Sequence, residues 1–326
     1  MVQYEPEFRL QREVGELFHR SEHNPILTAA QWSYPCNSVF NPAAVELETG
    51  ETLLLVRVED LRGFSHLTAA RSADGVTNWH IDEAPTLLPD PLTRPEELWG
   101  LEDPRAVWVE DLNTYVVTYT AFSEDGPLVA MARTDDFVDF HCQGPVMPPE
   151  DKNAALFPRR IGGQWLLLHR PASAHAAKRP HIWASRSKDL EYWSEPRPLL
   201  AARDGGWWDH TRIGLAAPPL ETPEGWLLFY HGVRDTVAGS IYRVGLALLD
   251  LEDPFRVIRR SGPWLLSPIA SYEREGDVPN VVFPCGTIYD AESDRLRLYY
   301  GAADTCVALA TCTLSDLLLW LKEHEA

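Results

Sequence analysis

Hydrophobic and polar positions alternate in short runs along the chain, and one arrangement of these runs recurs five times. Each copy has an entry of small residues or Pro, a polar turn and a β-rich apolar run, as in NPAAVELETGETLLLVRVED. The copies begin at residues 41, 102, 153, 214 and 280, in steps of 61, 51, 61 and 66 residues. Spacing this regular indicates an internal structural repeat.

A second apolar element follows each copy, as in HLTAARSADGVTNW, and ends in a polar turn that contains Asp. Short strands bounded by Gly, Pro, Asp and Asn predict an all-β protein. A repeat of roughly 50 to 65 residues holds one four-stranded antiparallel sheet with its loops. The pattern therefore predicts a five-bladed β-propeller, and a sandwich of irregular strands is the alternative.

The two ends of the chain depart from the repeat. Residues 1–40 precede the first copy, and we expect a short N-terminal arm that either completes the ring or covers one mouth of it. LSDLLLWLKEHEA, residues 314–326, is the one long segment with helical periodicity and predicts a C-terminal helix. The whole chain, 1–326, is thus expected to form a single propeller domain.

Composition narrows the partners. The 326 residues are 45% hydrophobic and 24% charged, as in ordinary globular proteins, and 29 basic against 48 acidic side chains give a net charge of −19. A field of this sign repels phosphate backbones and anionic membrane surfaces, so neither nucleic acid nor a membrane is an expected partner. The sequence leaves a homo-oligomer open.

Location and cofactors follow from what the sequence lacks. The N-terminal stretch has no apolar leader and no run of 18 apolar residues occurs, so we expect a cytoplasmic protein without a membrane span. The five cysteines, at 36, 142, 285, 306 and 312, show no zinc-ligand spacing. We interpret them as reduced thiols and expect no metal site.

The ends of the apolar runs carry the first candidate chemistry. In a propeller the inner strands line a central channel, so strand ends far apart in sequence meet near the axis. The residues at this phase of the repeat are Arg57, Thr120, Arg170, His231 and Asp304. An acidic protein that gathers Arg57, Arg170 and His231 at one mouth is expected to bind an anion there.

Two stretches begin with LEDP, and they occupy different phases of the repeat. Asp103, in LEDPRA, precedes an inner strand at the phase held by Asn41, Asn153 and Asn280, so we interpret it as a buried functional carboxylate. Asp253, in LEDPFR, follows a second-element strand, where Asp before Pro is an ordinary turn opener. We therefore interpret Asp253 as structural.

Aromatic and His side chains add weaker candidates. Trp207 and Trp208, in the loop DGGWWDHTR, are candidates for stacking on sugar faces. His66 could reach the same site but is interpreted as structural, and the role of His210 stays open.

Several motifs in order resemble one known family. They are WGLEDPRAVWVEDLNTYVVTYTAF, KNAALFPRRIGGQWLLLHRP, WWDHTRIGLAAPPL, LLFYHGV, YRVGLALLDLEDP and LYYGAAD, from about residue 24 to the end. Together they resemble glycoside hydrolase family 130, the β-mannoside phosphorylases and related β-mannosidases, which are five-bladed propellers.

The resemblance implies roles for particular residues. Asp103 corresponds to the catalytic acid, which in the phosphorylases acts through a hydroxyl of the bound mannose. Arg57, Asn153 and Asp304 correspond to residues that contact the mannosyl unit. The residues that correspond to the phosphate-binding set are Lys152, Arg170, Arg212, His231 and Tyr242. The family uses no metal or organic cofactor, and inorganic phosphate is the co-substrate.

These roles predict an inverting phosphorylase that converts a β-mannoside and phosphate to α-mannose 1-phosphate. A phosphorylase needs one catalytic carboxylate because phosphate is already an anionic nucleophile, whereas inverting hydrolysis needs two. One alternative is a β-mannosidase in which Asp209 or Asp60 activates water. Another is a propeller that binds glycans without catalysis. The linkage, β-1,2 or β-1,4, and the acceptor sugar stay open.

Overall fold

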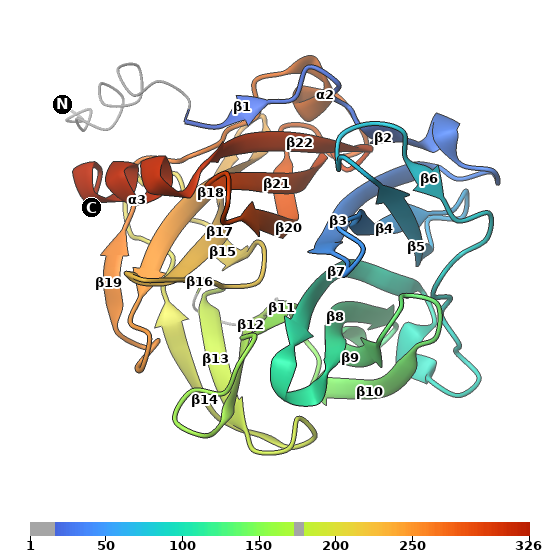
Figure 1. The fold of residues 1–326 in the computed structure, drawn as a ribbon, viewed down its shortest axis with the longest axis horizontal. Coiled ribbons are helices and arrows are strands. Elements are labelled where there is room, and N and C mark those ends of the chain that lie inside the picture. The colour runs from blue at the N-terminus through green and yellow to red at the C-terminus, as the bar shows by residue number, and fades with distance from the viewer. Residues whose placement is uncertain (1–16, 173–178) are drawn as a thin grey trace.

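The computed structural model describes residues 17–172 and 179–326 and has an all-β fold (Figure 1). This confirms the all-β part of the predicted fold. Residues 1–16 of the predicted N-terminal arm lie outside the described residues. The described helical segments are short: α2 (Ser271–Arg274), α3 (Leu314–Glu323) and the 3₁₀ turns Ala29–Gln31, Pro95–Glu97 and Glu110–Leu112.

The first two repeats form one eight-stranded sheet built from two antiparallel units. The first unit contains β3 (Ser38–Glu46), β4 (Thr52–Glu59), β5 (Ser65–Ser72) and β6 (His80–Ile81). The second contains β7 (Gly100–Val109), β8 (Thr114–Ser123), β9 (Gly126–Thr134) and β10 (His141–Met147). A single parallel pairing, between Ser65 and Gly100, joins the two units.

The next two repeats form separate sheets. One consists of β11 (Asp151–Leu156), β12 (Trp165–Pro171), β13 (Ile182–Ser187) and β14 (Trp193–Leu200). The other consists of β15 (Arg212–Leu215), β16 (Leu220–Thr222), β17 (Gly225–Thr236), β18 (Gly239–Leu249) and β19 (Val257–Arg260).

The last sheet combines the two ends of the described chain. It contains β20 (Val282–Asp290), β21 (Arg295–Ala302), β22 (Cys306–Thr313) and, from the N-terminal side, β1 (His19–Arg20) and β2 (Leu27–Thr28). Both N-terminal strands pair antiparallel with β22. Residues of the expected arm therefore extend the last sheet.

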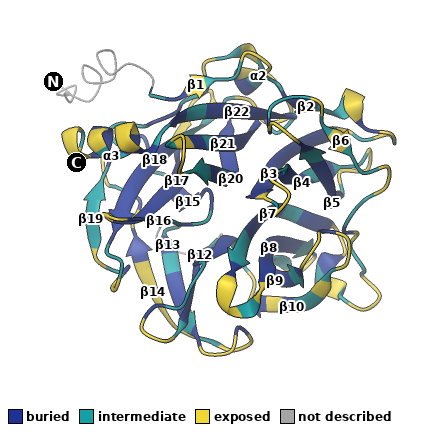
Figure 2. Cartoon of the chain, in the orientation of Figure 1, coloured by how far each residue is buried: buried dark blue, intermediate teal, exposed yellow. Residues whose placement is uncertain are grey.

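The strands differ in burial according to their place in the sheet. In Figure 1, β3, β7, β11, β15 and β20 lie nearest the middle of the molecule. The first eight residues of β3 are buried, whereas β14 has a run of five exposed residues (Figure 2). The continuous apolar runs of the repeat, such as those of β4 and β12, lie in the strands that pair with these inner ones and are also buried along most of their length.

The hydrophobic core is divided into clusters between neighbouring sheets. Leu227, Phe229 and Leu298 belong to a cluster that joins the sheet of β17 to that of β21. Val56 and Leu309 belong to another cluster, which joins the first unit to the last sheet. Because apolar burial is the main stabilising contribution to folding, these clusters hold the sheets side by side.

The polar turns of the repeat are capped by one recurring Asp. After the third strand of four units, an Asp side chain accepts hydrogen bonds of 2.8–3.0 Å from backbone N–H groups two and three residues on. The four are Asp74, Asp136, Asp189 and Asp250. Asp253 is exposed and donates its N–H to Asp250, so it lies in a turn, as interpreted from the sequence.

The predicted C-terminal helix is confirmed, although it ends at Glu323 rather than at residue 326. Thr313 Oγ1 caps its N-terminus by accepting from Asp316 N at 3.0 Å. Leu314, Leu317 and Trp320 are buried on one face of the helix. None of the helices in residues 17–172 and 179–326 has the length and apolar character of a transmembrane segment.

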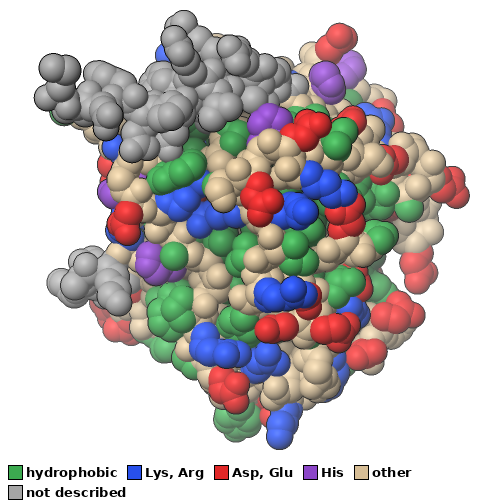
Figure 3. Space-filling view, turned by 90° about the vertical axis from the view of Figure 1, so that its left-hand side faces the viewer, with side chains coloured by type: hydrophobic (Ala, Val, Ile, Leu, Met, Phe, Trp, Pro, Cys, Tyr) green, Lys and Arg blue, Asp and Glu red, His purple; other side chains and the backbone are tan. Residues whose placement is uncertain are grey.

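Acidic and basic side chains are interspersed over the face of the molecule shown in Figure 3. The net charge of −19 is therefore not concentrated in one patch on this face. Repulsion of anionic polymers by this face is therefore an effect of the overall net charge and not of one acidic patch.

Candidate active site

One pocket, with a cavity volume of about 150 Å³, is lined by side chains from all five repeats. All nine residues to which the resemblance assigns a role line it: Arg57, Asp103, Lys152, Asn153, Arg170, Arg212, His231, Tyr242 and Asp304. Asn41, Glu102, Val281 and Phe283 line it as well. Segments as far apart in the chain as Asn41 and Asp304, 263 residues, thus meet at one place.

Bulges in three inner strands help to orient the side chains of the pocket. Asn41, Asp103 and Asn153 have left-handed backbones, with φ of 46°, 49° and 55°, in a conformation that Asn and Asp tolerate. Each lies where the pairing with the next strand skips a residue. A bulge of this kind re-aims a side chain. These three residues, which occupy the same position in the sequence repeat, therefore also share one backbone geometry in the structure.

Asp103 is held by two donors from the first unit. Its Oδ1 accepts from Arg57 Nη1 at 3.0 Å and from Asn41 Nδ2 at 2.8 Å, and only 6% of the residue is exposed. Burial raises the pKa of this carboxyl, but the positive charges of Arg57, Arg105 and Lys152 outweigh burial. The pKa of Asp103 is therefore lowered, and the carboxylate is ionised in the protein without ligands.

Arg57 also binds Glu102, which sequence reasoning missed. Arg57 Nη2 donates to Glu102 Oε1 at 3.0 Å, and Lys152 Nζ lies 3.6 Å from Glu102 Oε2. The one signal for Glu102 in the sequence was its position next to Asp103 in LEDPRA. Neighbouring side chains of a regular strand point to opposite faces, so strand alternation predicts that Glu102 points away from the site of Asp103. The bulge between Glu102 and Arg105 allows both carboxylates to line the pocket.

Lys152, Arg170 and Arg212 form a cationic wall of the pocket. Lys152 and Arg170 are direct cross-strand partners on β11 and β12. Arg212 Nη2 donates to Tyr242 Oη at 2.9 Å. Burial lowers the pKa of Arg170 to about 10, and the charge of Arg212 contributes. Like charges gathered in this way repel each other, so the wall favours binding of an anion.

Unpaired hydrogen-bonding atoms lie along the same pocket. Within the described part of the chain, Arg170 Nε and both ring nitrogens of His231 are buried without a hydrogen-bond partner. His231 is fully buried, and its ring centroid lies 4.5 Å from that of Phe283. Buried polar atoms are ordinarily paired, so unpaired ones around a cavity indicate where a polar ligand binds.

His231 differs from the sequence-based expectation in its charge. It was expected to add positive charge to the anion site. Burial lowers the pKa of His231 well below its usual value, and the charges of Arg170 and Arg105 lower it further. His231 is therefore neutral at physiological pH and can contribute an N–H donor but no charge.

The family model described as β-1,4-mannooligosaccharide phosphorylase, of glycoside hydrolase family 130, matches residues 18–323. The chain belongs to this family. This confirms the resemblance found in the motifs. The protein is therefore an enzyme of the family 130 phosphorylases.

Relatives and solved structures of family 130 cover nearly the whole chain. A β-1,4-mannooligosaccharide phosphorylase from Ruminococcus albus is 35% identical over 317 residues, which are 95% of this chain and 92% of the relative. A complex of β-1,2-mannobiose phosphorylase from Listeria innocua with β-1,2-mannobiose has a TM-score of 0.85 and 32% identity, over 94% of this chain and 99% of that one.

A third comparison concerns hydrolysis. A structure from work on glycoside hydrolases of family 130 that target β-1,2-mannosidic linkages in Candida mannan has a TM-score of 0.81 and 26% identity. It covers 93% of this chain and 95% of that one. Family membership alone therefore does not decide between phosphate and water as the nucleophile.

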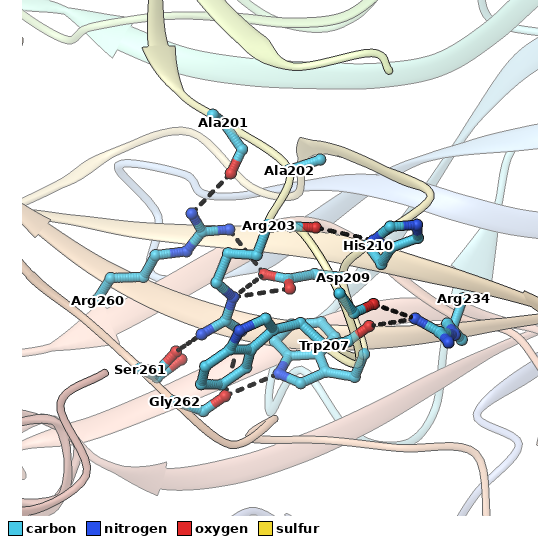
Figure 4. A network of polar contacts seen from close by, with 12 residues as sticks. Ala201, Ala202, Arg203, Trp207, Asp209, His210, Arg234, Arg260, Ser261 and Gly262 are labelled. Atoms are coloured by element: carbon cyan, nitrogen blue, oxygen red, sulfur yellow. Dashed lines mark hydrogen bonds and ion pairs between the residues drawn. The ribbon is translucent and has the colours of Figure 1, made fainter. Parts of the chain in front are cut away.

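Asp209, the base of the alternative hydrolytic mechanism, is not at the pocket of the family 130 chain. It is fully buried, binds Arg203 and Arg260 at 2.8 and 2.7 Å, and accepts from Tyr230 Oη at 3.1 Å (Figure 4). Both oxygens are thus engaged in a structural network, and the expectation that Asp209 could activate water was wrong. Asp60, the other suggested base, binds Arg62 instead.

The two Trp candidates belong to the same network. Trp208 stacks on Tyr230 with ring centroids 5.6 Å apart and donates to Gly262 O at 2.9 Å. The guanidinium of Arg203 lies 3.7 Å from the ring centroid of Trp207 (Figure 4). Neither Trp lines the pocket, so the expectation of sugar stacking there was wrong. Their packing anchors the loop that leads to Arg212.

The remaining candidates also lie outside the pocket. Thr120 is buried in β8 opposite Glu102 and does not line the pocket, unlike the other four residues at its phase. His66 lies 2.9 Å from Tyr34 Oη and 7% of it is exposed, which fits the structural role expected of it. His210 Nδ1 lies 2.7 Å from Arg179 Nη1, in the loop network.

Replacing Asp304 with Asn is expected to stabilise the protein at pH 8 more than at pH 5. Burial raises the pKa of Asp304 from 3.8 to about 7, and the Asp103 charge adds to the shift. The folded state therefore holds the extra proton between these values, and stability falls as pH rises through this window. Asn does not ionise, so the variant does not lose this stability as the pH rises. The resulting gain in its free energy of unfolding relative to wild type is at most about 4 kcal/mol.

Urea unfolding of wild type and Asp304→Asn at both pH values measures this difference. The exposed Asp253→Asn serves as the matched control and is expected to show no such pH dependence. A variant whose stability gain is the same at pH 5 and pH 8 would contradict the raised pKa.

Proposed function

We propose that the protein is an inverting β-mannoside phosphorylase, which transfers a mannosyl unit from a β-mannoside to inorganic phosphate. The products are α-mannose 1-phosphate and the shortened acceptor. The observation that carries the proposal is the combination, in one pocket, of Asp103 with the cationic wall and with the unpaired, buried Arg170 Nε and His231 ring nitrogens. A site built only for a neutral sugar has no need of such a wall.

In the proposed reaction a phosphate oxygen attacks C1 of the mannosyl unit from the face opposite the leaving group. The bond from C1 to the glycosidic oxygen breaks, and that oxygen takes the proton supplied by Asp103, through a mannose hydroxyl as in the related phosphorylases. Asp103 must be protonated for this step. Bound phosphate offsets the cationic charge that lowers the pKa of Asp103, so phosphate binding favours the protonated acid.

The pocket residues divide between the two substrates. In the proposal Arg57, Asn153 and Asp304 contact the mannosyl unit. Phosphate is held by Lys152, Arg170, Arg212, His231 and Tyr242. Arginine forks give phosphate a fixed orientation, which positions its attacking oxygen in line with C1. The phosphate brings its own nucleophilic charge, so the proposed glycosyl transfer uses no metal or organic cofactor.

The proposal includes the architecture and the location. A single five-bladed propeller over 1–326, closed by packing of the last sheet on the first, is supported by the apolar cluster that these two share. A cytoplasmic location is supported by the five cysteines, which are all free thiols, as is usual in reducing compartments.

Hydrolysis is the second candidate, favoured by the hydrolases within the family. It requires a second carboxylate to activate water on the face opposite Asp103. Of the described residues, Glu102 and Asp304 are the other carboxylates at the pocket. Glu102 is engaged by Arg57 and Lys152, and burial keeps Asp304 protonated up to about pH 7. A pKa near 7 suits a general base at neutral pH, so Asp304 is the base that this second candidate would use, whereas Glu102 is held by the two cations.

Incubation with β-1,2- and β-1,4-mannobiose, with and without inorganic phosphate, tests the proposal. Mannose 1-phosphate is measured by anion-exchange chromatography and its anomer by NMR. We expect the α anomer to form only when phosphate is present. Release of free mannose at the same rate without phosphate would refute phosphorolysis in favour of hydrolysis.

A further inference from the structure

Arg105 lies beneath the pocket and connects two strands that are not paired. It follows Asp103 on β7 and is only 2% exposed. Its Nη1 donates to Asp103 O at 2.9 Å, and its Nε and Nη2 donate to Ala216 O at 2.6 Å and Leu215 O at 2.9 Å. Both of the latter carbonyls lie at the end of β15.

These contacts join the two halves of the proposed reaction centre. β7 carries the acid, Asp103, and β15 begins with Arg212 of the cationic wall. The two strands belong to different sheets and are separated in chain order by the sheet of β11 to β14. The rigid guanidinium of Arg105 therefore links the backbone of Asp103, the acid, to the strand that carries Arg212, a proposed phosphate-binding residue, across the middle of the molecule.

The charge of Arg105 is not neutralised by its hydrogen bonds. In the described part of the chain, all of the hydrogen bonds that it makes go to neutral backbone carbonyls. Its guanidinium lies 5.9 Å from the ring centroid of Phe283, which lines the pocket. A buried charge without a direct counter-ion is costly, and an anion bound nearby would offset that cost.

The ionisable groups around the pocket respond to this charge. Burial raises the pKa of Asp103, and of the charges that lower it Arg105 contributes the most after Arg57. After burial and Arg170, it is also the next contribution that lowers the pKa of His231. The positive field of Arg105 therefore reaches both the acid and the phosphate side of the site.

We propose that Arg105 is a positioning residue that holds the strand of Asp103 against the strand of Arg212 and supplies buried positive charge for phosphate binding. This inference rests on the proposed phosphorylase function. In the described part of the chain, none of the hydrogen bonds of Arg105 is with Arg57, Asn153 or Asp304, the residues assigned to the mannosyl unit. Loss of Arg105 is therefore expected to affect phosphate binding more than mannoside binding.

The test compares Arg105→Gln, which removes the charge, with Arg105→Lys, which keeps the charge but loses the fork. KM for phosphate and KM for the mannoside are measured, together with calorimetric binding of inorganic phosphate alone. We expect Arg105→Gln to weaken phosphate binding by roughly tenfold or more. Its KM for the mannoside is expected to change by less than about threefold. Arg105→Lys is expected to lie between wild type and Arg105→Gln.

Arg297 provides the matched control because it also bridges two sheets, from β21 to Thr52 and Glu46. Arg297→Gln is expected to leave phosphate binding unchanged. Unaltered phosphate binding in Arg105→Gln, equal effects on both KM values, or failure of both Arg105 variants to fold would overturn the inference. Failure of the wild type to form mannose 1-phosphate would instead refute the proposed function, while calorimetry still reports on Arg105.

Discussion

Replacing Asp103 with Asn is expected to lower kcat for phosphorolysis by roughly 100- to 10,000-fold, the range attributable to a positioned general acid. An amide cannot supply the proton that the glycosidic oxygen requires. The carbonyl oxygen of Asn can still accept from Arg57 and Asn41, as Asp103 Oδ1 does at 3.0 and 2.8 Å. The variant should therefore keep the geometry of the pocket and lose only the proton.

Asp253→Asn is the matched control for this variant. Asp253 shares the LEDP context but is exposed, and its side chain makes none of the capping bonds of its turn, which go to Asp250. We expect its kcat to stay within about twofold of wild type. The comparison uses initial rates of mannose 1-phosphate formation. Equal losses in both variants would contradict the assignment of Asp103 as the acid.

The repeat phase predicted the pocket well because the relevant geometry is local. Asn41, Asp103 and Asn153 occupy one sequence phase, and in the structure they share a bulge and a left-handed backbone. The apolar runs are equally legible, because the strands that carry them, such as β4 and β12, are buried along most of their length. β14 has the opposite character: its exposed residues include Glu195 and Arg197, so it carries no such signal.

Side-chain contacts between distant segments were beyond the sequence. Trp208 was a candidate for sugar stacking and Asp209 a candidate base of the alternative hydrolysis, and both lie in the loop DGGWWDHTR. The loop instead folds into a network with Arg203 and Arg260 that sequence proximity does not reveal. The charge state of His231 was missed for a similar reason, since it depends on complete burial and on cations from other sheets.

Replacing Arg170 with Met is expected to reduce kcat/KM for phosphate by about 100-fold or more, because a charged fork to phosphate is lost. The same change is expected to raise Tm of the ligand-free protein by roughly 2 to 5 °C. Burial and the charge of Arg212 lower the pKa of Arg170 to about 10, so the charged form is destabilised in the folded state at neutral pH. Met removes that charge while filling similar space.

Phosphate should reverse the order of stability. Wild type at a phosphate concentration of about 100 times Kd gains roughly 2.7 kcal/mol, whereas Arg170→Met at the same concentration gains much less. Arg159→Met is the control, because Arg159 forms a surface ion pair with Glu221 and does not line the pocket. Thermal unfolding of wild type and both variants, with and without phosphate, measures these differences in stability. An Arg170 variant that is less stable than wild type without ligand, yet stabilised equally by phosphate, would show that Arg170 serves the fold and not the anion.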